Sequence, residues 1–377
     1  MYSLYIHFPF CRKKCRYCDF FSVPFHLKLS DTFLNELQQE WAITSKKYNL
    51  QQKLVSTIYC GGGTPSLLTP HQWDTFCNEI INRCHLSENI EWTIECNPDS
   101  FSAKKAKHWI QSGVNRLTIG VQSVNNRELS ILGRLHTSEQ ALDILYNQVL
   151  AKFRSVGVDI MYGIPGQTYE SLRHTLKTIL ACSSINHISA YELTFSENTP
   201  FFRHKKIFPL PSEDEIVEMN ELILSMLGEC GFEHYEISNY ALPGFESRHN
   251  QAYWYHKPYI GLGPSAHSYI HPKRFSNSGC MDTYFANVLN EKNPDSFSEI
   301  IDTQKMSYEM VFLRLRTKQG LNENEFFLKT GSHFNNPSRE KALKELLEKR
   351  YVVYKSPFWS LSEKGMLLAD AIIKRLL

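Results

Sequence analysis

Three cysteines near the start of the chain, Cys11, Cys15 and Cys18, are the residues whose type and spacing most directly indicate chemistry. The spacing is C-x3-C-x2-C, and no fourth cysteine lies at ligand distance along the sequence. A structural zinc site normally closes with four protein ligands, and a ferredoxin-type cubane uses four thiolates. Three thiolates therefore predict a [4Fe–4S] cluster with one iron open to a small molecule. The alternatives are three reduced loop cysteines or a partial zinc site.

A run of three glycines, Thr64 and Pro65 follows at residues 61–65. Glycine carries no Cβ, so backbone can approach a ligand closely here, although such a run also fits a tight turn. Glu95 and Asp159 are acidic residues in otherwise apolar segments. Buried carboxylates need partners. Either a ligand with hydroxyl and ammonium groups, or an internal salt bridge with Arg134 or Arg116, would supply them.

The first two-thirds of the chain alternates strand-like and helix-like segments. The expected strands are residues 2–8, 54–60, 90–96, 116–121, 156–162 and 187–193. The expected helices run from 30 to about 48, from 69, over 102–111, from 137 to about 153, from 168, and from 212 to about 228. Such alternation predicts an α/β fold with a parallel sheet, and six units predict a partial (β/α)6 TIM-like barrel. The cysteines, the glycines, Glu95 and Gln122 fall at or just beyond strand carboxyl ends, where barrels place their active sites.

The alternation ends near residue 231. We expect three parts: a partial barrel over 1–232, a connecting segment over 233–300, and a C-terminal, mainly helical, winged-helix-like domain over 301–377. The last part shows an amphipathic pattern at 306–316, a helical pattern at 341–349, short strand-like stretches at 351–354 and 359–361, and a terminal helix.

Composition narrows the class of protein. A net charge of +2 over 377 residues gives no global field for nucleic acid. No stretch approaches the ~20 apolar residues of a transmembrane segment. The apolar residues at the N-terminus precede the basic ones, the reverse of a secretory signal. The other seven cysteines lack ligand spacing and are expected to be small buried side chains in a reducing compartment, so we expect a cytoplasmic protein.

With these motifs the chain resembles the oxygen-independent coproporphyrinogen III dehydrogenases and their relatives, the bacterial heme chaperones of the HemW type. Both groups are radical S-adenosylmethionine (SAM) proteins. The resemblance rests on five motifs in order: Tyr-Ile-His-x-Pro-Phe-Cys, Gly-Gly-Gly-Thr-Pro, Glu-x-Asn-Pro, Gly-Val-Gln-Ser and Asp-x-x-Tyr-Gly-x-Pro-Gly-Gln. It implies that the three cysteines bind a [4Fe–4S] cluster whose open iron binds SAM. It further implies a SAM site formed by Tyr5, Tyr17, Gly62, Gly63, Thr64, Glu95, Gln122, Arg134 and Asp159.

Phe20 separates the two branches of this family. The dehydrogenases carry a further cysteine at this position, two residues after the third ligand. They also carry a long segment before the first strand, whereas strand-like sequence begins here at residue 2. Both features resemble the chaperone branch. Arg16 stands where a proline is frequent. The aromatic residues around the cysteine loop are expected to exclude water from the cluster; they are Phe8, Phe10, Tyr17, Phe20 and Phe21.

The segment His249-Asn250-x-x-Tyr253-Trp254 resembles one that the chaperone branch associates with heme binding. His249 offers an imidazole to heme iron, while Tyr253 and Trp254 offer flat apolar faces; the same cluster also fits ordinary packing. His7, His267 and His271 are rival ligands. The resemblance implies a protein that binds heme and passes it to an unidentified acceptor protein, with cluster-dependent homodimers. The alternative is an enzyme that decarboxylates coproporphyrinogen III to protoporphyrinogen IX.

Overall fold

The computed structural model describes residues 1–197, 199–204, 209–290 and 295–377. Six successive parallel strands form the centre of its main sheet. They are β1 (Tyr2–Phe8), β4 (Leu54–Gly62), β5 (His85–Cys96), β6 (Arg116–Gln122), β7 (Ser155–Tyr162) and β8 (His187–Glu192). Parallel strands in sequence order, each joined to the next through helices, are the βαβ pattern that the sequence predicted.

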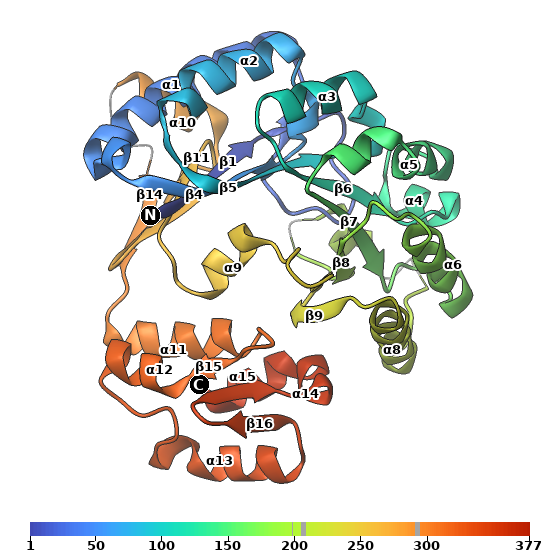
Figure 1. The fold of residues 1–377 in the computed structure, drawn as a ribbon, viewed down its shortest axis with the longest axis vertical. Helices are drawn as coiled ribbons and strands as arrows, with labels where there is room; N and C mark the ends of the chain where they lie inside the picture. The colour runs from blue at the N-terminus through green and yellow to red at the C-terminus, as the bar shows by residue number, and fades with distance from the viewer. Residues whose placement is uncertain (198, 205–208, 291–294) are drawn as a thin grey trace.

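Helices cover the outer face of this curved sheet, along the top and right of Figure 1. They are α1 (Leu27–Tyr48), α2 (Pro70–Glu79), α3 (Ala103–Gln111), α4 (Asn126–Leu132), α5 (Ser138–Leu145), α6 (Tyr169–Leu180) and α8 (Glu213–Glu229). Four of them begin with capping boxes, at Thr69, Thr137, Thr168 and Ser212. In each box the cap residue and the residue three positions later accept hydrogen bonds from each other's backbone amides, which the first turn of a helix leaves unpaired. This residue pattern is visible in the sequence, so these four helix starts could be predicted.

Six more strands extend the sheet beyond both edges of this centre. Beside β8 lie β10 (Asn239–Ala241) and β9 (Glu233–Glu236); beside β1 lie β11 (Tyr259–Leu262), β12 (His267–Ile270), β13 (Lys273–Asn277) and β14 (Asp295–Ile300). Residues 233–300, which we expected to connect two domains, therefore also build the sheet edges. The strand order ends at β14 and β9, and these edges do not pair within the described residues. The barrel is open, as predicted, whereas the three-part division of the chain stays a prediction.

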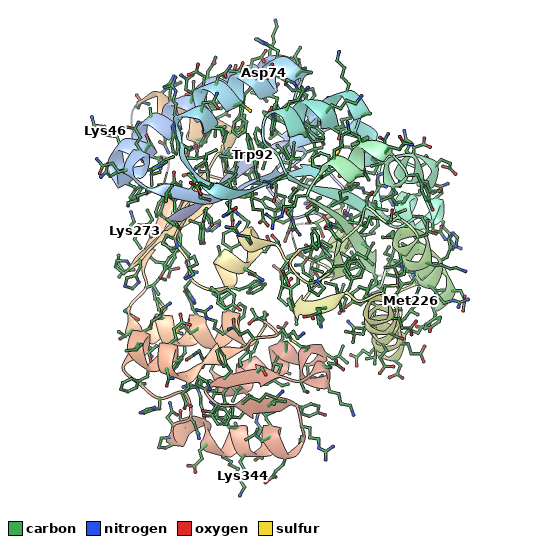
Figure 2. All side chains as sticks on the ribbon, in the orientation of Figure 1. Lys46, Asp74, Trp92, Met226, Lys273 and Lys344 are labelled. Carbon is green, nitrogen blue, oxygen red and sulfur yellow. The ribbon has the colours of Figure 1, made fainter. Side chains whose placement is uncertain are left out.

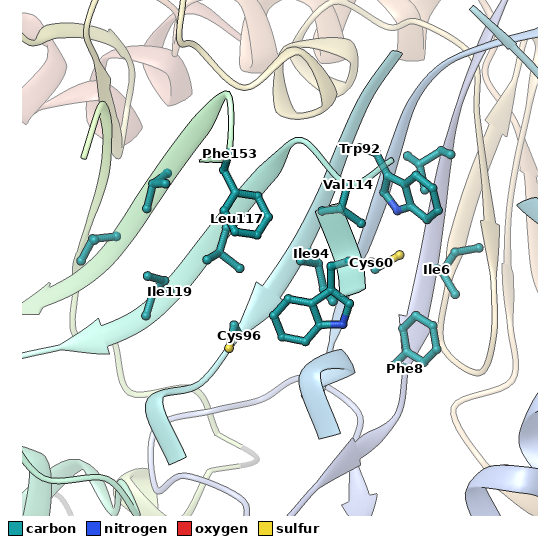
Figure 3. Packing of buried hydrophobic residues seen from close by; sticks show 14 of the residues in the cluster. Ile6, Phe8, Cys60, Trp92, Ile94, Cys96, Val114, Leu117, Ile119 and Phe153 are labelled. Atoms are coloured by element: carbon teal, nitrogen blue, oxygen red, sulfur yellow. The ribbon is translucent and has the colours of Figure 1, made fainter. Parts of the chain in front are cut away.

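The core lies along the parallel strands. Ile6, Ile94 and Ile119 have no exposed surface, and Figure 3 shows them among apolar side chains from neighbouring strands. Along β6, for example, Leu117, Ile119 and Val121 belong to this core, whereas the alternate residues Thr118 and Gln122 line a cavity on the other face. A one-residue slip of such a strand would turn its side chains to the opposite face, so this packing fixes the strand register and with it the positions of the strand-end residues.

A smaller unit follows, coloured orange to red in Figure 1. It consists of α11 (Thr303–Arg314), β15 (Leu321–Asn322), α12 (Glu323–Thr330), α13 (Pro337–Glu348), β16 (Val352–Lys355), β17 (Phe358–Leu361), α14 (Glu363–Leu367) and α15 (Ala369–Leu376). It has its own apolar cluster, which includes Phe326 and Trp359. In Figure 2 the labels of Asp74 and Lys344 mark the outer ends of the main sheet unit and of this smaller unit. The helical, winged-helix-like C-terminal unit is confirmed.

Three predicted boundaries are wrong. The third strand begins at His85, five residues before the predicted start at residue 90. The first helix begins at Leu27, so Ser30 lies inside its first turn and does not cap it; the Ser30 hydroxyl donates to the Leu27 carbonyl across 2.7 Å. The helix expected to reach about residue 153 ends at Leu145. Asn147 then caps a separate 3₁₀ turn by accepting a hydrogen bond from the Val149 amide across 3.1 Å. Asparagine favours such caps over helix interiors.

Two further expectations can be checked against the whole described chain. Cys230 and Cys280 are exposed, contrary to the expectation of burial for all cysteines outside the loop. Within the described residues, no helix has the length and apolar character that crossing a bilayer requires.

Candidate functional site

The loop that carries the three cysteines lies at the carboxyl end of β1. It leaves β2 (Phe10–Cys11) and returns in β3 (Val23–Pro24), which pairs with β2. The backbone amide of Arg16 donates to the Leu132 carbonyl across 3.0 Å. The backbone carbonyl of Arg16 accepts from the Phe201 amide, also across 3.0 Å. Arg16, the departure from the family pattern, thus ties the loop to two neighbouring segments.

A cavity of about 440 Å³ opens beside this loop, and all three cysteines line it. We call it the cysteine cavity. Its other lining residues include most of the remaining predicted SAM-site residues: Tyr17, Gly62, Gly63, Thr64, Glu95, Gln122, Arg134 and Asp159. Tyr5 does not line it. Residues from five strand ends and the cysteine loop therefore converge at one place, as expected for the carboxyl edge of a parallel barrel.

The glycine run allows β4 to approach the cysteine loop. The Gly63 amide donates to the Phe8 carbonyl across 2.7 Å. A Cβ at Gly63 would lie 2.6 Å from that oxygen, and one at Gly62, whose φ is +97°, would lie 2.5 Å from Nδ1 of His7. Only glycine fits these positions. The run is therefore a close approach of two backbones and more than a tight turn.

Hydrogen bonds join the cysteine sulfurs to the strand ends. Thr64 donates to Sγ of Cys11 across 3.5 Å, and Nη1 of Arg134 donates to Sγ of Cys15 across 3.6 Å. Asn97 connects the two donors: its Nδ2 donates to Thr64 across 3.0 Å, and its Oδ1 accepts from Arg134 across 2.6 Å. Asn97 is a site residue that the sequence analysis did not single out, although it stands two residues after Glu95 in a quoted motif.

The donor set fits an iron–sulfur cluster. Burial raises the pKa of the Cys11 thiol and raises that of Cys18 to about 11. A buried thiolate needs a nearby cation, which ligated iron supplies. No three His, Cys, Asp or Glu side chains of the described chain are grouped to hold a metal ion. The cysteines of a cubane bind different irons, so they stand further apart than the ligands of one zinc ion.

Of the two buried carboxylates, Asp159 has hydrogen-bonding capacity left for a ligand. Burial raises the pKa of Glu95 to about 7 and that of Asp159 to about 6. Among the described residues neither forms a salt bridge with an arginine; Arg116 instead lies 3.8 Å from Glu91. Oδ1 of Asp159 and Nε of Arg134 are buried without a hydrogen-bond partner in that part of the chain. Oδ1 of Asp159 can accept a hydrogen bond from a hydroxyl or ammonium group, and Nε of Arg134 can donate one to a hydroxyl or carboxylate oxygen; SAM has all three groups.

Gln122 ends β6 in the left-handed region, with φ at +67°. Residues other than glycine rarely adopt this conformation, and such outliers concentrate at functional sites. Gln122 lines the cysteine cavity, so the strained position and the cavity coincide.

A second cavity of about 610 Å³ adjoins the first. We call it the aromatic cavity, because five tyrosines, two phenylalanines and three histidines line it: Tyr5, Tyr59, Tyr191, Tyr253, Tyr259, Phe20, Phe21, His7, His249 and His267. Asp19, Phe20, Tyr59, Gly62, Glu95 and Tyr191 line both cavities. The sequence analysis did not identify Tyr59 and Tyr191 as site residues, because a tyrosine in an apolar strand is normally interpreted as a core residue.

His249 lies in the wall of the aromatic cavity, on α9 (Arg248–Trp254), the yellow helix on the inner side of the sheet in Figure 1. Its side chain is buried, with the residue 1% exposed. Its Nδ1 lies 2.8 Å from the Thr57 hydroxyl and its Nε2 lies 2.7 Å from the Tyr253 hydroxyl. Tyr253 lines the cavity, whereas Trp254, which we expected to offer a flat face, does not.

The expected aromatic shield of the cysteine loop is only partly present. Phe8 and Phe10 are buried, but they pack into the core against Phe33, with ring centroids 6.0 and 5.4 Å away. Phe20 is 61% exposed, so the expectation that it excludes water is wrong for this conformation. Tyr17 lines the cysteine cavity and packs against the apolar cluster around Leu132.

Known proteins resemble the chain over its whole length. Residues 5–179 match the radical SAM superfamily and residues 302–368 match the HemN C-terminal domain. The heme chaperone HemW of Bacillus subtilis (strain 168) is 34% identical, across 99% of this chain and 98% of that protein. The heme chaperone HemW of Lactococcus lactis subsp. lactis (strain IL1403) is 32% identical, across 100% of this chain and 97% of that protein.

A solved structure shows the same fold. The coproporphyrinogen III oxidase HemN of Escherichia coli, a radical SAM enzyme, superposes with a TM-score of 0.86 at 23% identity, over 99% of this chain and 89% of that one. The radical SAM match implies a [4Fe–4S] cluster and SAM, the two groups that the cysteine cavity fits. With both matched segments in order and full-length relatives of one name, the chain belongs to the radical SAM superfamily and, within it, to the HemW family of heme chaperones.

Proposed function

We propose that this chain is a heme chaperone: it binds a [4Fe–4S] cluster, SAM and heme, and passes heme to an acceptor protein. The observation that carries the proposal is the pair of adjoining cavities with a shared wall, in a chain whose full-length relatives are named heme chaperones. One cavity offers thiols and polar groups, and the other offers aromatic faces.

In this proposal Cys11, Cys15 and Cys18 hold the cluster, and the rest of the cysteine cavity holds SAM. A cluster with one open iron supplies one-electron chemistry to SAM. The guanidinium of Arg134 lies beside Sγ of Cys15 and stabilises negative charge on the sulfur. Asp159 binds a hydroxyl or ammonium group of SAM through Oδ1, which has no hydrogen-bond partner within the described residues, and Glu95, which lines the same cavity, binds another.

Heme binds in the aromatic cavity. Its volume of about 610 Å³ lies within the ~300–1,000 Å³ of small-molecule sites, and aromatic rings suit a flat apolar macrocycle. The predicted heme-binding segment supports this location, because His249, Asn250 and Tyr253 all line the cavity. The role of His249 as iron ligand stays a prediction, and both of its ring nitrogens are already paired in this conformation.

The alternative is a coproporphyrinogen III dehydrogenase. Two observations favour the chaperone. The full-length relatives are named heme chaperones, and Phe20 stands at the position where the dehydrogenases carry a further cysteine. The test is an anaerobic assay of the cluster-loaded chain with SAM, a reductant and coproporphyrinogen III, with the Escherichia coli coproporphyrinogen III oxidase as a positive control. We expect product from the control and none from this chain. Protoporphyrinogen formed by this chain would reverse the proposal.

The identity of the acceptor protein, the cytoplasmic location and the homodimer stay predictions.

A further inference from the structure

We propose that His267 supplies the imidazole that binds the heme iron in the aromatic cavity, while His249 positions the wall of that cavity. The inference rests on the proposed function, since it requires that heme binds there. It concerns which of the candidate histidines presents a free nitrogen to the cavity.

His267 is the histidine of this cavity whose ring is available. It lines the cavity and is exposed at the first position of β12. Within the described ranges, no side-chain hydrogen bond or ion pair involves its ring. A neutral imidazole with an unpaired nitrogen on the surface of an aromatic cavity is the group that heme iron recruits.

The rival histidines do not offer this. His249 has a hydroxyl on each ring nitrogen, and withdrawing it would leave the Thr57 hydroxyl without this partner in a buried place. His7 is 3% exposed, with the Tyr5 hydroxyl 3.0 Å from Nδ1 and the Phe21 carbonyl 2.8 Å from Nε2. His271 lies outside the residues that line the cavity, and its Nδ1 faces the Tyr269 hydroxyl at 3.2 Å.

The backbone of His267 is held in a fixed place. The residue pairs with Ser276 across the β12–β13 ladder, and the next residue, Ser268, accepts a hydrogen bond from the Gly261 amide across 2.9 Å. A Cβ on Gly261 would collide with the His267 carbonyl oxygen, so this approach depends on glycine. An iron-binding side chain on a strand of a constrained hairpin is preorganised, because its backbone loses little conformational freedom when the side chain binds iron.

His249 acts on the porphyrin through Tyr253. Its Nε2 is 2.7 Å from the Tyr253 hydroxyl, and the Tyr253 ring stands at 82° to that of Tyr259, with centroids 4.6 Å apart. Both tyrosines line the cavity. Loss of His249 therefore disturbs the wall for any porphyrin, with or without iron, whereas loss of His267 removes only the bond to iron.

This difference sets the experiment. The cluster-loaded full chain is titrated with hemin and, separately, with metal-free protoporphyrin IX. We expect His267→Ala and His267→Gln to lower hemin affinity at least about tenfold and to shift the Soret band, and to leave protoporphyrin IX affinity within about twofold. Added imidazole should restore the Soret position of His267→Ala. His249→Ala should weaken both ligands, and His271→Ala, the matched control on the same hairpin, should weaken neither.

Two outcomes would overturn the inference. If both His267 variants bind hemin with the wild-type affinity and Soret band, His267 is not the ligand. If His249→Ala loses only the hemin-specific affinity while keeping protoporphyrin IX, the ligand is His249. In either case wild-type hemin binding would leave the proposed function standing. A wild-type chain that binds neither hemin nor protoporphyrin IX would refute the proposed function itself. Iron content and circular dichroism of each variant establish that it is folded and loaded.

Discussion

The Tyr59 hydroxyl donates a hydrogen bond to Oε1 of Glu95 across 2.7 Å. Both residues line the cysteine cavity and the aromatic cavity. The Tyr59 ring also lies close to that of His249, with centroids 5.0 Å apart. A ligand in the cysteine cavity that binds the Glu95 carboxylate must therefore alter the Tyr59 ring, which also lines the aromatic cavity.

This contact predicts coupling between SAM and heme. Saturating SAM should change the hemin dissociation constant of the wild-type chain about fivefold or more, and hemin should change SAM affinity by the same factor. In Tyr59→Phe, which lacks the hydrogen bond, that factor should fall toward one. Hemin titrations with and without SAM measure it.

The control for this coupling is Tyr162→Phe. That hydroxyl accepts a hydrogen bond from Asn220 across 3.2 Å and lines neither cavity. The control should keep the wild-type factor. Coupling of wild-type size in Tyr59→Phe would contradict the role given to this hydrogen bond.

The cysteine loop predicts a clear loss of iron. After anaerobic reconstitution the wild-type chain should hold about four non-heme irons, and Ala at Cys11, Cys15 or Cys18 should remove the cluster. Cys230→Ala is the matched control, because Cys230 is exposed and lies outside the cysteine cavity. Iron and sulfide analysis and the visible absorbance measure the outcome. A full complement of iron in all three loop variants would remove the cluster from this site.

Glu95 predicts a pH dependence of stability. Its pKa is raised from 4.5 to about 7, mainly by burial, so the folded chain holds this proton over a range where the unfolded chain has lost it. The contribution of Glu95 is therefore fully present below about pH 4.5 and is lost as pH rises through about 7. Relative to wild type, Glu95→Gln should gain stability between pH 5 and pH 8, by on the order of 3 kcal/mol at most.

Denaturant unfolding of the SAM-free chain at the two pH values measures this gain. Glu170→Gln is the control, because that side chain is exposed on α6 and its partner Arg173 is exposed as well. A stability difference between Glu95→Gln and wild type that does not change with pH would contradict the shifted pKa.

The sequence predicted the parts of the site whose residue types are unusual at strand ends. The cysteines, the glycine run, Glu95 and Gln122 converge on one cavity as expected from strand order. It could not separate Tyr5 from the SAM-site residues, because Tyr5 lies in β1, the strand that leads to the cysteine loop, but lines the neighbouring cavity.

The state of His249 could not be predicted either. Its partner Thr57 lies 192 positions away in the sequence, so no local pattern reports the hydrogen bond that occupies Nδ1. Asn97 was missed for the same reason, because it acts by joining Thr64 and Arg134, which only the fold brings together.

The central claim is that one chain holds the cluster and heme side by side. The most direct measurement is a hemin titration of the cluster-loaded chain in the presence of SAM, with heme and non-heme iron counted on the same purified sample. The account predicts about one heme and about four non-heme irons per chain. A sample that binds heme only after losing its cluster, or that keeps its cluster and binds no heme, would contradict it.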